Sequence, residues 1–121
     1  IEYTGEIDEI ARVHAAFDGF DLDFYCSMRL GLRQDMVFHG DAGFIRLSAP
    51  FNTLTYGMAE VALVRPNRSE IIERFDDKQY KLMVEAFGAA MAGEIPFPYP
   101  LEMSLGTQVM IDRAFASSPA P

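Results

Sequence analysis

The chain has 121 residues, of which 50% are apolar and 23% are charged, a composition typical of a folded globular protein rather than a disordered one. This length predicts a single domain over residues 1–121 with a core of its own. Eighteen acidic side chains against ten basic ones give a formal net charge of −8. Because the nucleic-acid backbone is also negatively charged, this balance argues against nucleic acid as a partner.

The sequence lacks the features of a membrane protein or of a disulfide-linked one. No apolar run reaches the roughly 18 residues that a membrane-spanning helix needs. The opening IEYTGEIDEI is acidic where a signal peptide is basic and then apolar. The single cysteine, Cys26, excludes an intrachain disulfide and a zinc site built from cysteines. We therefore expect a cytoplasmic protein with no membrane partner.

Apolar and polar residues alternate over the first part of the chain, which is the period of a β-strand. The clearest strand runs from Phe20 to Leu30, with Phe, Leu and Cys side chains on one face and mainly acidic and polar ones on the other. Asp18-Gly19 predicts a two-residue hairpin that joins this strand to an earlier one over residues 11–17.

The segment FHGDAGFIRLSAPFN, residues 38–52, predicts a second hairpin. Strands at 34–39 and 44–49 flank the turn residues 40–43, and Pro50 ends the second strand. Two further strands are expected, at residues 61–64 and 71–75. The short connections between successive strands predict an open-faced, mostly antiparallel sheet of about six strands.

The apolar period becomes helical after residue 76. Asp76 or Asp77 is placed to cap the first turn of this helix, and Gly93 lies just past its end. Phe87 is central in the apolar stripe, which we expect to face the sheet. Alanine at this position should therefore cost roughly 3 to 5 kcal/mol through lost burial and a residual cavity.

A second helix is expected from Leu101 to about Ser117, opened by Pro100. The proline-rich segment before it, residues 94–100, cannot be helical. Strands followed by helices predict an α+β fold in which the C-terminal helices pack on one face of the sheet.

The other face of the sheet is then expected to be open and apolar. The predicted strands carry apolar side chains on both registers, including Val37, Ile45 and Leu47. A surface of this kind is typical of a partner interface, and we expect it to pair with a second copy of the chain. The alternative is that another part of the same protein covers it.

Two runs of the sequence together resemble the C-terminal domain of the glucose-fructose oxidoreductase, inositol dehydrogenase and MocA (Gfo/Idh/MocA) family. In the first run, a strand with Ser and Gln leads to a Gly-x-x-Gly turn and then to a Pro-Phe ending. In the second run, a Gln-Tyr pair opens a helix with a Glu-Ala-Phe core. The matching positions are Gly40 to Gly43, Pro50-Phe51, Gln79-Tyr80, Glu85 to Phe87, Ile111-Asp112 and Ser117-Ser118. The resemblance covers nearly all of residues 10–118.

This resemblance implies that the chain is the C-terminal substrate and oligomerisation domain of a larger NAD(P)-dependent dehydrogenase for a sugar, polyol or related alcohol. In the family, an N-terminal Rossmann domain binds NAD or NADP and a Glu-Lys-Pro segment supplies a catalytic lysine. This sequence contains neither that segment nor a Gly-x-Gly-x-x-Gly fingerprint. We therefore expect no catalytic residue, no bound cofactor and no activity in the isolated chain, whose partner would be the Rossmann domain.

Two residues are candidates for contact with the substrate. Tyr80 matches a family position close to the substrate pocket, although its place on the apolar stripe fits a core residue equally well. Arg33 could hold a hydroxylated or anionic substrate. We expect His14 and His39 to be surface or satisfied histidines rather than catalysts, and their spacing offers no metal site.

A function of a different class is also compatible with the sequence. The chain could be a non-catalytic α+β module that serves dimerisation or ligand binding, since no catalytic motif lies within it.

Overall fold

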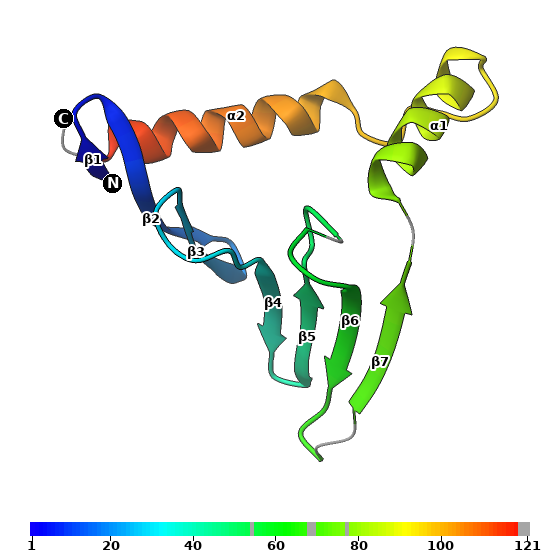
Figure 1. Ribbon diagram of the computed structural model, residues 1–121, viewed down its shortest axis with the longest axis horizontal. Coiled ribbons are helices and arrows are strands. Elements are labelled where there is room, and N and C mark those ends of the chain that lie inside the picture. The colour runs from blue at the N-terminus through cyan, green and yellow to red at the C-terminus, as the bar shows by residue number, and fades with distance from the viewer. Residues whose placement is uncertain (54, 68–69, 77, 119–121) are drawn as a thin grey trace. The chain divides into compact units, whose positions relative to one another are not determined.

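The computed structural model describes residues 1–53, 55–67, 70–76 and 78–118, and has an α+β fold with two antiparallel sheets and two helices (Figure 1). The strands are β1 (Glu2–Thr4), β2 (Ile7–Phe17), β3 (Phe20–Ser27), β4 (Asp35–Gly40), β5 (Gly43–Ser48), β6 (Ala59–Val64) and β7 (Glu70–Phe75). The helices are α1 (Gln79–Met91) and α2 (Leu101–Ala116).

The chain forms two compact units. The first comprises Ile1–Gly31 and the described residues from Tyr99 onward, and therefore contains β1, β2, β3 and α2. The second comprises Leu32–Pro98 and contains β4 to β7 and α1. The prediction of one sheet with about six strands is therefore wrong, because the seven strands divide into a sheet of three and a sheet of four.

The first sheet has the order β1-β2-β3, and its two hairpins turn at glycines with positive φ, Gly5 and Gly19. Strand β1 was not predicted, because three residues are too few to show a period. In the β2–β3 hairpin, Phe17 lies opposite Phe20, and the two rings stack with centroids 4.7 Å apart. The predicted two-residue turn at Asp18-Gly19 is confirmed.

The second sheet is an antiparallel meander with the order β4-β5-β6-β7, and Figure 1 shows its strands side by side in chain order. Its first turn lies between Gly40 and Gly43, as predicted. Gly43 has φ +131°, and a Cβ on it would lie 2.2 Å from the carbonyl oxygen of Val64 on β6. The close approach of β6 therefore requires glycine at this position.

The register of the second sheet separates two unlike faces. Directly opposed residues share a side of the sheet, so the register assigns each residue to one face. One face, called here the apolar face, has a single charged residue, Glu73. Its other members are Met36, Phe38, Ile45, Leu47, Ala59, Val61, Leu63, Ile71 and Phe75. The opposite face, called here the charged face, carries Asp35, Arg46, Glu60 and Arg74.

This register shows that the open face was predicted with the wrong set of residues. Ile45 and Leu47 do belong to the apolar face, but Val37 lies opposite Arg46 and therefore belongs to the charged face. The three residues cannot form one surface. Sequence alternation fixes which residues share a side within one strand, whereas the pairing of neighbouring strands depends on the turn between them.

Helix α1 ends as predicted but begins differently. At its C-terminal end Gly93 has φ +76°, and Gly93 N–H donates to the Ala90 carbonyl while Glu94 N–H donates to the Ala89 carbonyl. This is the Schellman arrangement that satisfies the last carbonyl groups. At the other end Lys78 occupies the N-cap position, so Asp76 is not the cap, and Asp77 lies outside the described residues.

Helix α2 matches the predicted bounds closely, with Pro100 at its N-cap position, Glu102 in its first turn and Arg113 in its last. These charges oppose the partial charges of the helix ends. Within the part of the chain that the structure describes, neither helix is long and apolar enough to cross a membrane.

The predicted packing of the helices on one sheet face is wrong, because neither α1 nor α2 contains a buried residue. Among the described residues, Ile10 and Ala49 are the buried apolar ones. Phe87 is 55% exposed, and its ring meets Phe97 edge to face with centroids 6.3 Å apart. Phe87 thus covers the proline-rich segment after its own helix instead of the sheet.

Replacing Phe87 by alanine should lower the free energy of unfolding by only about 1 kcal/mol, which is what an aromatic edge contact contributes. Ile10→Ala is the comparison, because that side chain is 3% exposed and removal of a buried isoleucine costs about 2 to 5 kcal/mol. Urea unfolding of both variants measures the difference. Equal losses would contradict the exposed position of Phe87.

Candidate functional site

Side-chain hydrogen bonds that join distant parts of the second unit, 17 to 28 residues apart in sequence, meet at the segment that follows β5. We call this cluster the Asn52 joint; its members are Gln34, Phe51, Asn52, Gln79 and Tyr80. They come from three places in the chain: the residue before β4, the Pro-Phe-Asn segment after β5, and the first turn of α1. Tyr80, a predicted site residue, is therefore held by parts of the chain that are distant in sequence.

Gln34 fixes the segment after β5. Its side-chain Oε1 accepts hydrogen bonds from the backbone N–H groups of Phe51 and Asn52, at 3.2 and 2.9 Å. Its backbone carbonyl accepts a longer bond, 3.4 Å, from the N–H of Ala49. These contacts replace the ladder bonds that end with β5, so the chain can turn without leaving its donors unsatisfied.

The turn passes through a buried residue with an unusual conformation. Ala49 has φ +45° and is only 1% exposed. The left-handed region costs roughly 1 kcal/mol or more for a residue with a Cβ, so the surrounding bonds must hold this conformation in place. Pro50 follows Ala49, and β5 ends at Ser48, so the predicted end of the strand before Pro50 is confirmed.

Two side chains from the start of α1 complete the joint. Gln79 donates from Nε2 to the backbone carbonyl of Phe51. The phenol of Tyr80 donates to Oδ1 of Asn52 at 2.9 Å. The Tyr80 residue is nevertheless 63% exposed, so of its two proposed roles the structure does not support a core position.

Arg33, the second predicted site residue, lies one residue before Gln34 and donates from Nη2 to Oδ2 of Asp35 at 3.1 Å. Asp35 also accepts two bonds from Arg46, with Nε and Nη2 each 3.0 Å from a carboxylate oxygen. The hydrogen bonds from Arg46, followed by those from Arg33, lower the pKa of Asp35 below its ordinary value. Arg33 therefore has a carboxylate partner within the chain.

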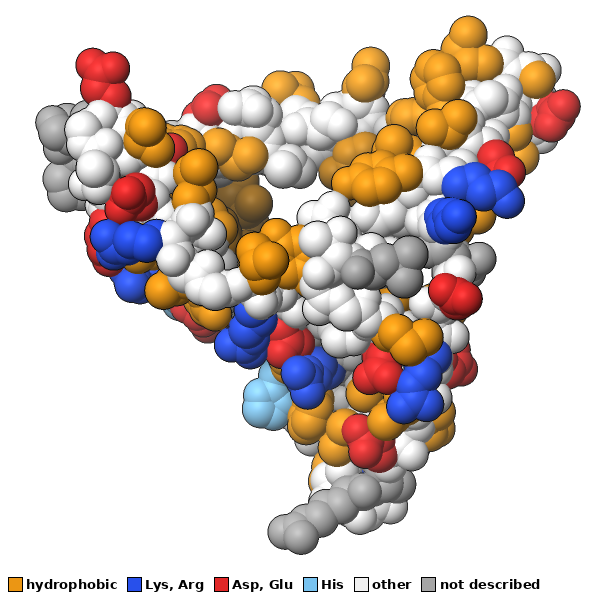
Figure 2. Space-filling model, in the orientation of Figure 1, with side chains coloured by type: hydrophobic (Ala, Val, Ile, Leu, Met, Phe, Trp, Pro, Cys, Tyr) orange, Lys and Arg blue, Asp and Glu red, His pale blue; other side chains and the backbone are white. Residues whose placement is uncertain are grey.

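These contacts begin a row of alternating charges across the charged face. Arg74 on β7 donates to Glu60 on β6 at 2.6 Å, and the pKa of Arg46 is raised, mainly by the hydrogen bond with Asp35. Basic and acidic side chains alternate across this part of the surface in Figure 2. Pairs of this kind favour the pairing of neighbouring strands, although solvent screens them where the arginines are exposed.

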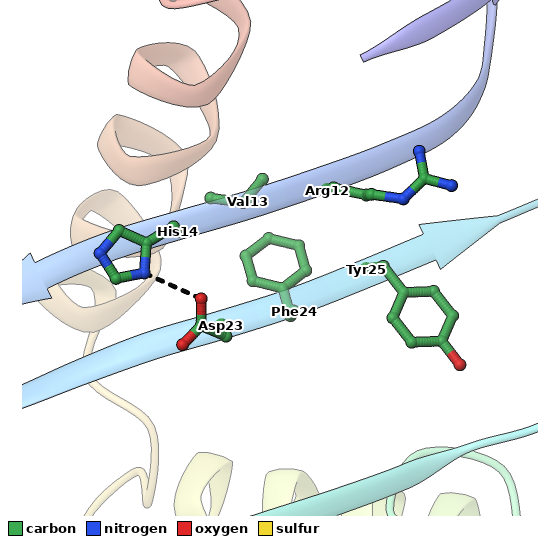
Figure 3. A pocket seen from close by; sticks show the side chains of 6 residues that line it. All are labelled: Arg12, Val13, His14, Asp23, Phe24 and Tyr25. Atoms are coloured by element: carbon green, nitrogen blue, oxygen red, sulfur yellow. Dashed lines mark hydrogen bonds and ion pairs between the residues drawn. The ribbon is translucent and has the colours of Figure 1, made fainter.

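A second candidate lies in the first unit, where the β2–β3 hairpin has an open hollow of about 360 Å³ (Figure 3). Its lining residues are Arg12, Val13, His14, Asp23, Phe24 and Tyr25. Nδ1 of His14 lies 2.8 Å from Oδ1 of Asp23, directly across the strand pair. The hydrogen bond and the charge of Asp23 raise the pKa of His14 above its ordinary value.

The charged residues of this hollow are paired and largely exposed. Arg12 is paired with Glu2, and the side chains of His14 and Asp23 are 64% and 77% exposed. His14 thus fits the expected surface histidine with a satisfied partner. No group of three or more metal-ligating side chains occurs among the residues that the structure describes.

The two predicted substrate residues therefore lie in one unit and are connected through neighbours rather than in contact. Arg33 adjoins Gln34, whose amide holds Asn52, and Asn52 accepts the bond from Tyr80. Gln34, Asn52 and Gln79 were not predicted as site residues. Their partners are 17 to 28 residues away, a separation at which sequence alternation carries no signal.

No protein-family model and no curated protein matches this chain.

The pairing of His14 with Asp23 should make the stability of the β2–β3 hairpin depend on pH. Because the pair favours protonated imidazole, its contribution to hairpin stability is present at acidic pH and is lost as the pH rises through the raised pKa of His14. Asp23→Asn should bring this pKa back toward about 6.5. Histidine NMR titration measures it. Asp21→Asn is the matched control, since Asp21 acts on His14 only weakly by charge, and an equal fall in both variants would contradict the assignment.

Proposed function

We propose that the chain is the substrate-side and oligomerisation domain of an NAD(P)-dependent oxidoreductase that acts on a sugar, polyol or related alcohol. The observation that carries this proposal is the Asn52 joint. Three motif segments on which the family resemblance rests, the Gln of the strand, Pro-Phe and Gln-Tyr, are hydrogen-bonded to one another. A shared contact gives a physical reason for these residue types to occur together in this order.

In the proposed enzyme, Tyr80 and Arg33 contact the substrate from this domain. A Rossmann domain binds NAD or NADP, whose nicotinamide accepts or donates the hydride, and a Glu-Lys-Pro segment outside this chain supplies the catalytic lysine. Within this chain, the exposed phenol of Tyr80 binds and orients a hydroxyl group, and Arg33 stays oriented by Asp35. We place the enzyme in the cytoplasm.

The test uses the full-length protein that contains this chain, screened with sugars and alcohols for nicotinamide reduction. Tyr80→Phe should lower kcat/KM about 2- to 10-fold, which is the effect of one lost hydrogen bond. Tyr99→Phe, an exposed tyrosine in the proline-rich segment, is the matched control and should have no effect. The isolated chain should show no NAD(P)H binding by calorimetry.

Absence of any nicotinamide reduction by the full-length protein would favour the alternative function, a non-catalytic module for dimerisation or ligand binding. Micromolar binding of NAD(P)H to the isolated chain would contradict the proposal that the Rossmann domain, and not this chain, binds the cofactor.

The apolar face of the second sheet supports self-association as a second role. Ile71, Ile45 and Phe75 on this face are 49%, 40% and 43% exposed. The charged face is unsuitable, because burial of its ion pairs would carry a desolvation cost. We propose that two copies pair apolar face to apolar face, in an isologous two-fold contact that buries more than roughly 1,200 Å².

Light scattering at micromolar concentration should give about twice the monomer mass of 13.6 kDa. Ile71→Lys should shift the protein to monomer, because it places a charge in the apolar face. Ile72→Lys is the matched control, since Ile72 is similarly exposed, at 42%, but lies on the charged face opposite Ala62. A monomeric wild-type chain, or equal effects of the two substitutions, would exclude this interface.

A further inference from the structure

Asn52 has a hydrogen-bonding group that the joint does not use. Its backbone N–H donates to Gln34 and its side-chain Oδ1 accepts from Tyr80. The two N–H groups of its side-chain amide have no hydrogen-bond partner among the described residues. A primary amide has two donors and an acceptor on adjacent atoms, so the unused donors lie beside the oxygen that Tyr80 contacts.

The phenol oxygen of Tyr80 can accept a hydrogen bond from a ligand, which complements the donors of the Asn52 amide. Because its proton is donated to Asn52, its oxygen has lone pairs available as an acceptor. An amide donor and a phenol acceptor therefore lie side by side at the surface. The ring of Tyr80 is exposed beside them and can cover the C–H groups of a ligand.

We propose that Asn52 is a second substrate-contact residue and that, with Tyr80, it binds two neighbouring hydroxyl groups of the substrate. One hydroxyl accepts from the Asn52 amide and the other donates to the Tyr80 oxygen. This inference rests on the proposed function, because it assigns a specificity residue to the same site. A mono-alcohol leaves one of the two groups without a partner, and a carboxylate has no donor for the phenol oxygen.

The joint holds both side chains in place before a ligand binds. Asn52 is fixed through its backbone by Gln34, and the helix turn that carries Tyr80 is fixed by the bond from Gln79 to the Phe51 carbonyl. Binding therefore requires little ordering of the protein, which favours affinity. The pair is open to solvent, so we expect weak binding by the isolated chain, with Kd on the order of millimolar.

The experiment follows the Asn52 side-chain amide of the isotope-labelled chain by NMR during titration with cis-1,2-cyclohexanediol. The expected result is a saturable shift that is about tenfold weaker with cyclohexanol, which has the same ring and one hydroxyl fewer. Asn52→Asp keeps the acceptor for Tyr80 and removes the amide donors. It should weaken diol binding about tenfold, as judged from the Tyr80 ring signals.

Asn67→Asp is the matched control, because it makes the same change of charge at an exposed turn residue and should leave diol binding unchanged. Unchanged backbone spectra of Asn52→Asp show that the fold is intact. No shift at saturating diol, equal shifts with cyclohexanol, or equal effects of the two variants would overturn the role of Asn52. Diol binding together with an inactive full-length protein would instead overturn the proposed dehydrogenase and leave the hydroxyl site standing.

Discussion

The second unit depends on the side-chain amide of Gln34. Its oxygen accepts the backbone N–H groups of Phe51 and Asn52 where the ladder of β5 has ended, so one side chain acts as a short continuation of the sheet. The segment held in this way is also the contact point for α1, through Gln79 and Tyr80. Without Gln34, the backbone N–H groups of Phe51 and Asn52 would lose their acceptor in the segment that α1 contacts.

Much of the local structure could be predicted from the sequence, because it follows from short-range rules. The alternation in β3, the turn at Gly40 to Gly43 and the helix end at Gly93 each depend on residues within a few positions of one another. The turn and the helix end lie where they were predicted, whereas β3 ends at Ser27, three residues before the predicted Leu30. The N-cap of α1 was predicted at Asp76 or Asp77, but the structure places Lys78 at this position.

The parts that could not be predicted depend on contacts between distant residues. The side of the sheet on which Val37 lies is decided by its pairing with Arg46 across a turn. The side chain of Asn52 is hydrogen-bonded to Tyr80, 28 residues later. Phe87 lies on a helical apolar stripe but contacts Phe97 rather than a strand, since periodicity identifies an apolar face without identifying what covers it.

The alternating charges of the second sheet also limit how many layers can stack on it. The side chains of Asp35 and Glu60 are only 14% and 34% exposed, so their arginine partners cover them and leave a hydrated surface. Another protein layer on that side would have to remove this water from every ion pair. Stacking on that side is therefore disfavoured relative to the apolar face, where Glu73 is the single charged residue to desolvate.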